Sequence, residues 1–501
     1  MFLHKFLPMV CLCGSALLAY GTTPVVTVTS PKPGSSVGSP INFVASASSP
    51  SCSKGISAMR IYTSPTLNAY TVDASSLNTN INLPTGSYST VVQAWDNCGG
   101  VGKTTVNITV NKITYPPPKF LYATEYAAGK IAGYTVDPLT GSIGPTSQGT
   151  VAAHTDPVDI ASDLGGYRLY VANQGSNNLD AYFIYRNTGQ LVPVPGSPVA
   201  LAGPGDRVIV HPSGLFVYAS STTTGSGEIN AFAVQSNGSL KPVPGSPFAV
   251  SGSATGALAM DPQGDYLYAS SSSSVGAVAA FTIDKVNGAL TPVAGSPFIV
   301  PLGACDPSAD FCQEGPTDLA VAPSGKYLYA VLGIESAIAA YAIDRSTGTL
   351  TDLAGSPYPE QSPEGDFCPF SAFGACPYSW TESIDPQGKF IYVADTQFND
   401  FSIFDINATS GVPTFSTTVT GTTTHSGICV PYTVNVDPSG SFIYDLGASG
   451  TNGCTMAGSN AVLGFSINQG NGQLLSVPGS PFVNVNVHTT KVSQEKVIVT
   501  P

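Results

Sequence analysis

The sequence predicts an all-β fold, a seven-bladed β-propeller preceded by an immunoglobulin-like β-sandwich. One observation is a unit of four short apolar runs, clearest between Gly315 and Tyr358, in which turn residues separate the runs. Another is a short motif that ends in tyrosine and recurs along the chain, at Tyr122, Tyr170, Tyr218, Tyr268, Tyr329, Tyr392 and Tyr444. Repetition of a four-stranded unit at such a period is typical of propellers.

The composition agrees with a turn-rich β protein. Only 10% of the residues are charged, and the chain contains 53 glycines and 41 prolines. The formal net charge is −13, which argues against a nucleic-acid partner because the phosphate backbone attracts basic surfaces. We expect no cofactor.

Residues 1–21 have the pattern of a secretory signal peptide. His4 and Lys5 form a basic start, an apolar stretch follows from Phe6 to Leu18, and small residues precede Thr22. The apolar stretch is too short to span a bilayer and no later stretch is longer, so we predict secretion without membrane insertion.

Cysteine usage supports an oxidising compartment. After removal of the signal peptide eight cysteines remain, and they form local pairs in the sequence. We predict four disulfides and no metal site, because no Cys-x-x-Cys motif or paired histidine accompanies them. The predicted pairs are Cys52–Cys98, Cys305–Cys312, Cys368–Cys376 and Cys429–Cys454.

Residues 22–112 form a separate β-domain in this interpretation. Five runs alternate apolar and polar residues between Pro, Gly and Ser clusters, which is a sandwich pattern. The region resembles bacterial immunoglobulin-like modules, with Trp95 as a core aromatic. We interpret it as a spacer or adhesive module. Residues 113–119, with three consecutive prolines, are predicted as a stiff linker.

The propeller is predicted over residues 120–501. No run that matches an inner strand precedes the second strand of its first blade. The run that begins at Phe120 matches the second strand of the repeat. Residues 495–501 (EKVIVTP) match the first-strand run DRVIVHP at 206–212. We therefore predict that the C-terminal segment completes the first blade.

The run from Tyr266 to Phe298 (YLYA…AAFTID…NGALTPVAGSPF) resembles the propeller-type 6-phosphogluconolactonase family and the related YVTN-type repeats. The resemblance covers Phe120 to Pro501. It implies an Arg-His pair at the head of an inner strand, followed by a His-Pro-x-Gly turn. Arg207 matches the arginine, but no histidine follows it. His211 occupies a turn position where other repeats have Asp or Ala, and we interpret it as turn-forming.

One face of the propeller carries the irregular loops. Connections between blades, and those between second and third strands, share this face, whereas the other face carries uniform tight turns. Loops on a rigid scaffold are the usual place for binding. The first face carries His154, His425, His488 and the propeller cysteines.

The heads of the inner strands open on the same face. Their aligned residues are Asp159, Arg207, Ala257, Asp318, Thr381, Thr433 and Lys496, with Glu382 next to Thr381. A lactone hydrolase needs a base for water and a cation for the developing oxyanion. The cation would be Arg207 or Lys496, and the base His154, His488, Asp159 or Glu382.

The candidate catalytic residues are Arg207, His154 and Glu382, and the candidate substrate-binding residues are Asp159, Asp318, Thr381, Lys496, His425 and His488. An alternative is that these charges only cross-link neighbouring blades around a water-filled channel. Two functions therefore stay open: a secreted lactone hydrolase, and a non-catalytic extracellular binding or surface protein. We expect a monomer whose ligand is a small molecule or carbohydrate at the channel mouth.

Overall fold

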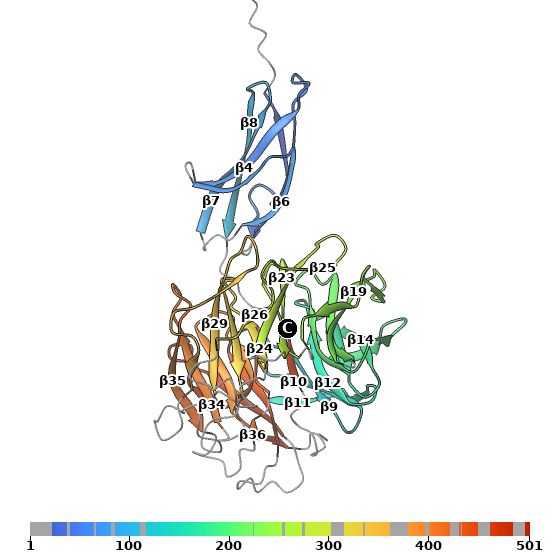
Figure 1. The fold of residues 1–501 in the computed structure, drawn as a ribbon. Coiled ribbons are helices and arrows are strands. Elements are labelled where there is room, and N and C mark those ends of the chain that lie inside the picture. Colours follow the sequence, from blue (N-terminus) through green and yellow to red (C-terminus); the bar gives the residue numbers. More distant parts are fainter. Residues whose placement is uncertain are drawn as a thin grey trace, which may run out of the picture. The chain divides into compact units, whose positions relative to one another are not determined.

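The chain forms two compact units, Met1–Thr114 and Tyr115–Pro501, and every regular element described is a β-strand (Figure 1). The predicted all-β fold is confirmed. The structure is a computed structural model that describes residues 23–37, 41–64, 67–81, 86–110, 117–223, 225–252, 256–272, 276–301, 315–333, 336–360, 379–395, 400–420, 430–431, 433–448, 461–483 and 496–501. The predicted signal peptide lies outside these ranges.

The first unit is a β-sandwich of two sheets. Buried side chains from both sheets, such as Phe43, Met59 and Val92, form one core between them. One sheet has the order β1-β3-β6, with β1 (Val25–Ser30), β3 (Ile41–Ser48) and β6 (Ser76–Ile81). The other has the order β2-β8-β7-β4-β5, with β2 (Ser36–Val37), β8 (Val101–Val110), β7 (Gly86–Asp96), β4 (Ile56–Ser64) and β5 (Leu67–Val72).

Trp95 is not part of this core, so its prediction as a core aromatic was wrong. In β7 the buried positions alternate through Val92 and Ala94, and Trp95 falls on the other side of the strand. Its half-buried ring is covered by the Arg60 guanidinium, 5.1 Å from the ring centroid. Because successive side chains of a strand point to opposite faces, Trp95 faces away from the core that Val92 and Ala94 face.

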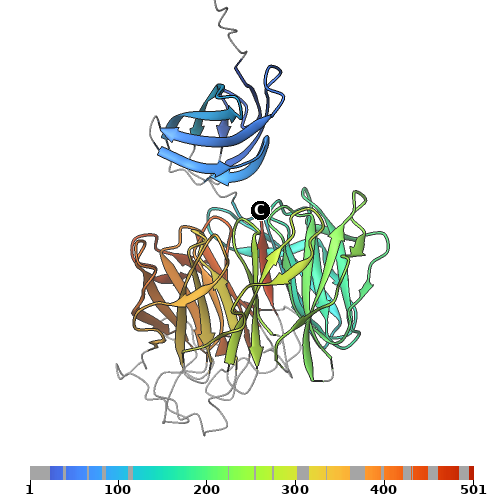
Figure 2. The same cartoon turned by 45° about the horizontal axis from the view of Figure 1, so that its top comes forward.

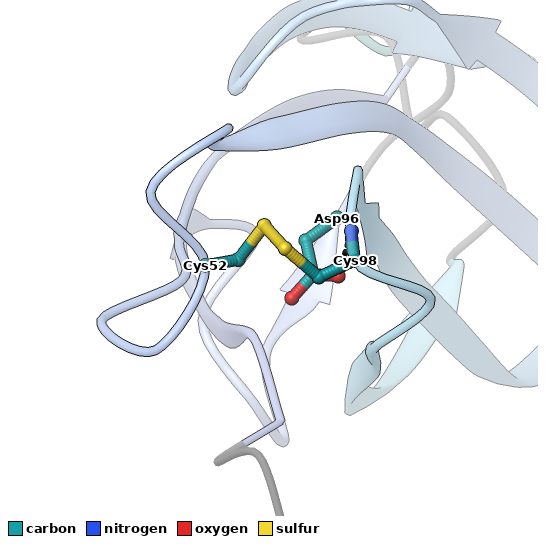
Figure 3. A group of neighbouring side chains, drawn as sticks. All are labelled: Cys52, Asp96 and Cys98. Atoms are coloured by element: carbon teal, nitrogen blue, oxygen red, sulfur yellow. Dashed lines mark hydrogen bonds between the residues drawn. A yellow bond between two sulfur atoms is a disulfide. The ribbon is translucent and has the colours of Figure 1, made fainter.

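A disulfide joins Cys52 to Cys98 in the first unit (Figure 3). Beside it, the Asp96 carboxylate accepts hydrogen bonds from the Ser49 hydroxyl and from the backbone N–H groups of Cys98 and Gly100. These bonds, with Ser49 first, lower the pKa of Asp96. The other six cysteines of the predicted pairs lie outside the described residues.

The second unit consists of seven antiparallel sheets, which Figure 2 shows as successive blades coloured from cyan to red. Each blade has an inner strand, two middle strands and an outer strand. The inner strands are β42 (Val497–Thr500), β12 (Pro157–Ser162), β17 (Gly205–Val210), β22 (Leu258–Met260), β27 (Asp318–Val321), β32 (Ser379–Ile384) and β37 (Asn435–Val436), with β36 (Val430–Pro431) preceding β37.

The tyrosine motif lies in the second strands, which are the buried centre of each blade. These strands are β9 (Phe120–Glu125), β13 (Arg168–Asn173), β18 (Phe216–Thr223), β23 (Tyr266–Ser272), β28 (Tyr327–Leu332), β33 (Phe390–Asp395) and β38 (Phe442–Ala448). The third strands are β10 (Lys130–Val136), β14 (Asn178–Tyr185), β19 (Ser226–Val234), β24 (Gly276–Ile283), β29 (Ala337–Ile343), β34 (Asp400–Ile406) and β39 (Ala461–Ile467).

In five of the blades, the Gly-Ser-Pro motif interrupts the outer strand and separates it from a short returning segment. After the motif the chain returns to pair with the third strand again, and the motif serine accepts a third-strand N–H, as Ser296 does from Ala280 at 2.9 Å. The outer strands are β11 (Ile143–Ala152), β15 (Gln190–Pro193), β20 (Leu240–Pro242), β25 (Leu290–Pro292), β30 (Leu350–Asp352), β35 (Pro413–Thr420) and β40 (Leu474–Ser476). The returning segments are β16 (Val199–Ala200), β21 (Phe248–Val250), β26 (Phe298–Ile299), β31 (Tyr358–Pro359) and β41 (Phe482–Val483).

The seven blades form a closed ring. Each inner strand lies next to the inner strand of the following blade, and β37 of the last blade lies next to β42 of the first. β42 pairs with β9 in an antiparallel ladder that places Val499 opposite Leu121. Residues more than 370 positions apart in the chain, such as Thr124 and Lys496, are therefore hydrogen-bonded to each other.

Tyrosine hydroxyls connect neighbouring blades. In six blades the motif tyrosine is buried and donates a hydrogen bond to a glycine carbonyl in the turn between the third and fourth strands of the next blade. The six bonds run from Tyr122 to Gly189, Tyr218 to Gly288, Tyr268 to Gly348, Tyr329 to Gly411, Tyr392 to Gly472 and Tyr444 to Gly141.

Glycine is required at these turn positions for two reasons. Gly141 has a φ of 73°, in the left-handed region that disfavours residues with a Cβ. A Cβ there would also lie 2.5 Å from the ring of Phe442 in the preceding blade. The glycine thus permits the turn, the aromatic contact and the tyrosine hydrogen bond together.

Tyr170 is the exception, since its buried hydroxyl has no partner among the described residues. The turn that it would reach, in the third blade, is one residue shorter. There Gly238 donates to Gln235, three residues back, whereas Gly288 in the next blade donates to Asp284, four residues back. The shorter turn keeps the Gly238 carbonyl out of reach of Tyr170.

Candidate functional site

An ion pair crosses the centre of the propeller. Lys496 immediately precedes β42 in the first blade, and its Nζ lies 3.6 Å from Oδ2 of Asp318, at the start of β27 in the fifth blade. The first and fifth blades are not neighbours in the ring, so the two side chains meet across the axis. Both are largely enclosed, with side-chain exposures of 17% and 13%.

Arg207 extends this cluster of charges. It lies in β17 of the third blade, and its Nη1 contacts the Asp206 carboxylate at 3.2 Å. Burial opposes its charge, but Asp206, Asp159 and Asp318 together keep the pKa of Arg207 above its usual value. Burial is the largest influence on Lys496, and it lowers the pKa of that amine.

Asp159 brings the second blade into the cluster. The residue is 7% exposed, and its Oδ2 accepts the Val208 N–H at 2.7 Å. Burial raises the pKa of Asp159 to about 6, although Arg207 and Lys496 favour its ionised form. A carboxylate that titrates near neutral pH can both accept and return a proton.

Glu382 is the most enclosed acid at the centre. It lies in β32 of the sixth blade, and its buried carboxyl lies close to the backbone of Ala320 in the preceding blade. Burial, together with the neighbouring Asp318 charge, raises the pKa of Glu382 well above its usual value. Burial in this setting therefore favours the protonated form of the carboxyl.

Several of these side chains also join adjacent blades. Asp159 accepts the N–H of Val208 in the next inner strand. Asp318 accepts the N–H of Glu382 at 3.2 Å, and Thr381 accepts that of Val434 at 3.1 Å, in both cases from the next blade. Structural cross-linking, the alternative that the sequence left open, therefore describes part of what these residues do.

Besides Thr381, the uncharged positions of the set are Ala257 and Thr433, and they contribute little chemistry. Ala257 is fully buried. The Thr433 hydroxyl accepts the Leu446 N–H within its own blade. The charges are thus concentrated on the first, second, third, fifth and sixth blades.

His154 lies apart from the central cluster. Its Nδ1 is 2.9 Å from Oδ1 of Asp180, and its backbone N–H donates to Oδ2 of the same carboxylate. The imidazole is 44% exposed and borders a surface hollow of about 420 Å³ that residues 126–129 and 153–156 line. The structure therefore does not bring His154 together with Arg207 and Glu382 through any described contact.

Other blades show what the Asp180 position does. Asp180, Asn230 and Ser402 occupy the same register position, opposite the residue that follows the motif tyrosine. Asn230 accepts the Ala202 N–H, and Ser402 donates to Glu360, in each case in the segment that enters from the preceding blade. Anchoring that segment is the role shared by these three blades, and among their described residues the second blade supplies a histidine for it.

His211 lies in a turn on the opposite face, as expected. It is buried, with Nδ1 2.7 Å from the Ser213 hydroxyl and Nε2 3.0 Å from the Gly264 carbonyl of the next blade. Burial lowers its pKa. His425 and His488 lie outside the described residues.

Two acidic partners in the propeller were not predicted from the sequence. Asp206 lies one position before the aligned strand heads, and Asp180 lies in a third strand rather than in a loop. An alignment of the seven repeats shows a polar residue at the Asp180 position in three of them, Asp180, Asn230 and Ser402, and this is the signal that could have pointed to it.

The described residues contain one group of three metal-ligating side chains within 4.8 Å of one another, Cys52, Asp96 and Cys98 (Figure 3). Both sulfurs are bonded to each other, so neither is available as a thiolate ligand. No helix in the described ranges is long and apolar enough to cross a membrane.

Comparison with known proteins places the fold. A family profile described as lactonase, 7-bladed beta-propeller, matches residues 113–205, 203–305 and 312–484. A comparison with curated protein sequences gives no significant match.

Solved structures show the same architecture. The Pseudomonas aeruginosa periplasmic gluconolactonase is 18% identical with a TM-score of 0.58, over 76% of this chain and 99% of that chain. A 6-phosphogluconolactonase candidate from Bacteroides uniformis is 17% identical with a TM-score of 0.55, over 76% of this chain and 100% of that one. At such identities the similarity extends to the fold alone.

Proposed function

Because the chain belongs to the lactonase family of seven-bladed β-propellers, we propose that it is a secreted hydrolase that opens a lactone ring at the centre of the propeller. The observation that carries the proposal is the pairing of a carboxylate that titrates near neutrality with a cation. Asp159, with a pKa of about 6, interacts with Arg207 and Lys496 at the heads of the inner strands. Lactone hydrolysis needs this combination of a base and a positive charge.

Asp159 is the base in this mechanism. Its Oδ2 is held by Val208, so Oδ1 is the atom that takes a proton from water. The water oxygen attacks the lactone carbonyl and the carbonyl oxygen becomes negatively charged. Arg207 stabilises that charge, because its guanidinium stays protonated in this enclosed setting.

Ring opening requires a proton for the leaving oxygen. When the bond between the carbonyl carbon and the ring oxygen breaks, protonated Asp159 or Glu382 supplies that proton, and the product is a hydroxy acid. Glu382 suits the acid role because burial and the Asp318 charge raise the pKa of its carboxyl and so favour the protonated form. Lys496 and Asp318 then serve to position these groups across the axis.

His154 is the competing base. Asp180 holds its Nδ1, which leaves Nε2 to act on water, and a hollow of about 420 Å³ adjoins it. The same pairing also anchors the loop, as in other blades. The two bases lie at different sites, so mutation separates them.

The test is turnover of a lactone panel by the purified protein and four variants. We expect Asp159→Asn to lower kcat by about 10²–10⁴-fold and Arg207→Ala by about 10²–10³-fold, typical of losing a base and an oxyanion partner. The wild-type rate should rise with pH through about 6 as Asp159 ionises, and Asp159→Asn should lose that dependence. His154→Ala should retain activity.

The control is His211→Asp, which places in this turn the residue that Asp261 and Asp385 provide in sister blades. It should leave turnover unchanged. If His154→Ala abolishes activity and Asp159→Asn does not, the base is His154 and the central site is wrong.

A non-catalytic binding protein is the second candidate function. It is favoured by the engagement of both central cations, Arg207 with Asp206 and Lys496 with Asp318. In that case no lactone of the panel is hydrolysed, and Asp159→Asn changes stability alone.

The compartment belongs to the same proposal. The Cys52–Cys98 disulfide and the signal-like residues 1–21 support an oxidising, extracytoplasmic location. An immunoglobulin-like spacer role for the first unit, a monomeric state and a small-molecule or carbohydrate ligand remain predictions.

A further inference from the structure

The second blade differs from its six sister blades at one edge of the propeller. On the face with the tight turns, Tyr167, Arg168, Phe183, Ile184 and Tyr185 line a surface hollow of about 410 Å³. Tyr167 immediately precedes β13 and Arg168 begins it. The other three residues are the last three of β14. This hollow, the blade-2 hollow, lies at the opposite strand ends from Asp159 and Arg207.

At three positions that line this hollow, the second blade has a residue type that differs from the one at the equivalent position of most other blades. Where the second blade has Tyr185, the sister blades have Asp137, Gln235, Asp284, Asp344, Asn407 and Asn468. Most of these cap their turn: Asp284, for instance, accepts the N–H groups of Val286 and Asn287. Tyr185 gives up this capping and exposes 56% of its surface instead.

The other two replacements are at the first residue of β13 and at the residue before it. Arg168 stands where every sister blade has an aromatic residue, Phe120, Phe216, Tyr266, Tyr327, Phe390 or Phe442. Tyr167, 55% exposed, stands where four sister blades have Lys or Asp, and the remaining two have Leu and Ser. A capping group and a packing aromatic are thus replaced together by exposed rings and a guanidinium.

One arginine that lines the hollow, Arg168, and one that adjoins it, Arg186, bring positive charge to this part of an acidic protein. The chain has a formal net charge of −13, and its arginines are Arg60, Arg168, Arg186, Arg207 and Arg345. The Arg186 guanidinium stacks over the Tyr167 ring at 4.8 Å and donates to its hydroxyl at 3.1 Å. Among the described residues no carboxylate pairs with Arg186.

Arg168 is only partly neutralised. Its Nη1 is 3.5 Å from Asp163 Oδ2, and its buried Nε has no described hydrogen-bond partner. The other oxygen of Asp163, Oδ1, accepts the backbone N–H groups of Tyr167 and Arg168. The hollow therefore combines aromatic rings with the 26% exposed Arg168 side chain and the adjoining Arg186 guanidinium.

We propose that the blade-2 hollow binds a sugar acid, a saccharide ring that carries a carboxylate. Arginine pairs with carboxylates through two parallel hydrogen bonds, and the tyrosines provide an apolar body with a hydroxyl at its tip for a hydroxyl-rich ring. A hollow of this size accommodates one or two rings. The inference does not depend on the reaction proposed above, because none of its residues belongs to the central cluster.

The experiment measures binding of trigalacturonate to the full chain by calorimetry, with neutral maltotriose and a triglutamate peptide as comparison ligands. We expect trigalacturonate to bind more tightly than either, with an affinity that falls as salt is added. Arg186→Ala and Tyr185→Asp should each weaken binding by about 10-fold or more, the loss of one charge-assisted contact.

The matched control is Arg345→Ala. Arg345 occupies the Arg186 position in the fifth blade, where Asp344 replaces the tyrosine, so its loss should leave binding unchanged. Tyr185→Asp restores the sister-blade residue and should melt no lower than wild type, which separates lost binding from unfolding. Equal binding of maltotriose, equal binding of triglutamate, an equal effect of Arg345→Ala, or no binding at all would each overturn the proposal.

Discussion

Lys496 Nζ and Asp318 Oδ2 lie 3.6 Å apart across the axis of the propeller. The pair connects the segment that enters β42 to the inner strand of the fifth blade. This ion pair therefore supports closure of the ring in addition to the ladder between β42 and β9 and the Tyr444–Gly141 hydrogen bond.

Lys496→Met should destabilise the protein by about 1–3 kcal/mol, because it leaves a largely enclosed Asp318 without its cation. Denaturant unfolding measures the change, and combination with Asp318→Asn gives the coupling energy. The control is Lys285→Met, which breaks the Lys285–Asp265 pair, whose side chains are 53% and 37% exposed. It should cost no more than about 1 kcal/mol. Equal costs for the two lysines would contradict the assignment.

Tyr218→Phe should cost about 1 kcal/mol, since it removes the hydrogen bond to the Gly288 carbonyl in the next blade. Tyr170→Phe removes a buried hydroxyl that has no described partner, so it should be neutral or stabilising. Melting temperatures of the two variants provide a direct comparison within one protein. A loss for Tyr170→Phe as large as that for Tyr218→Phe would show that Tyr170 has a partner.

Asp400→Asn should raise stability at pH 8 and have little effect near pH 4. Burial, with the nearby Asp395 and Glu360 charges, raises the pKa of Asp400 to about 8. The unfolded chain loses this proton near pH 4 while the folded chain keeps it, so wild-type stability falls as pH rises from about 4 to 8. The slope from one proton is at most about 1.4 kcal/mol per pH unit.

Unfolding of Asp400→Asn and wild type across this pH range isolates the contribution. Asp405→Asn in the same strand is the control, because Asp405 is exposed. If the difference between Asp400→Asn and wild type does not grow with pH, Asp400 is already ionised in the folded protein.

Removal of residues 489–501 should unfold or aggregate the propeller. The deletion takes away β42, which leaves the backbone groups of β9 unpaired along an exposed edge. The first unit has its own core and should keep its own melting transition. Calorimetry follows both transitions, and an unchanged propeller transition would refute the role of β42.

The repeat itself makes the propeller predictable. A buried tyrosine at each blade centre must recur with the blade, so the spacing from Tyr122 to Tyr444 indicates the fold from the sequence alone. The match between residues 495–501 and 206–212 likewise indicates β42, because inner strands share one apolar pattern.

The sites are harder to predict because they depend on which blades face each other. Nothing in the local sequence indicates that Lys496 reaches Asp318, since their contact depends on the geometry of the whole ring. His154 shares a face with Arg207 in the sequence interpretation, yet a third-strand residue, Asp180, determines its position. A difference of one residue in turn length, as at Gly238, is also not apparent from the apolar pattern.

The pairing of β42 with β9 has a consequence for the time course of synthesis. Thr500 contacts Phe120 across 380 residues of sequence. At about 5–20 residues per second, roughly 20–80 seconds pass between the synthesis of the two strands. During that interval β9 has no inner neighbour, and its edge is open to pairing with other chains. The yield of folded protein should therefore depend on translation speed and on the concentration of nascent chains more strongly than the stability of the finished ring suggests.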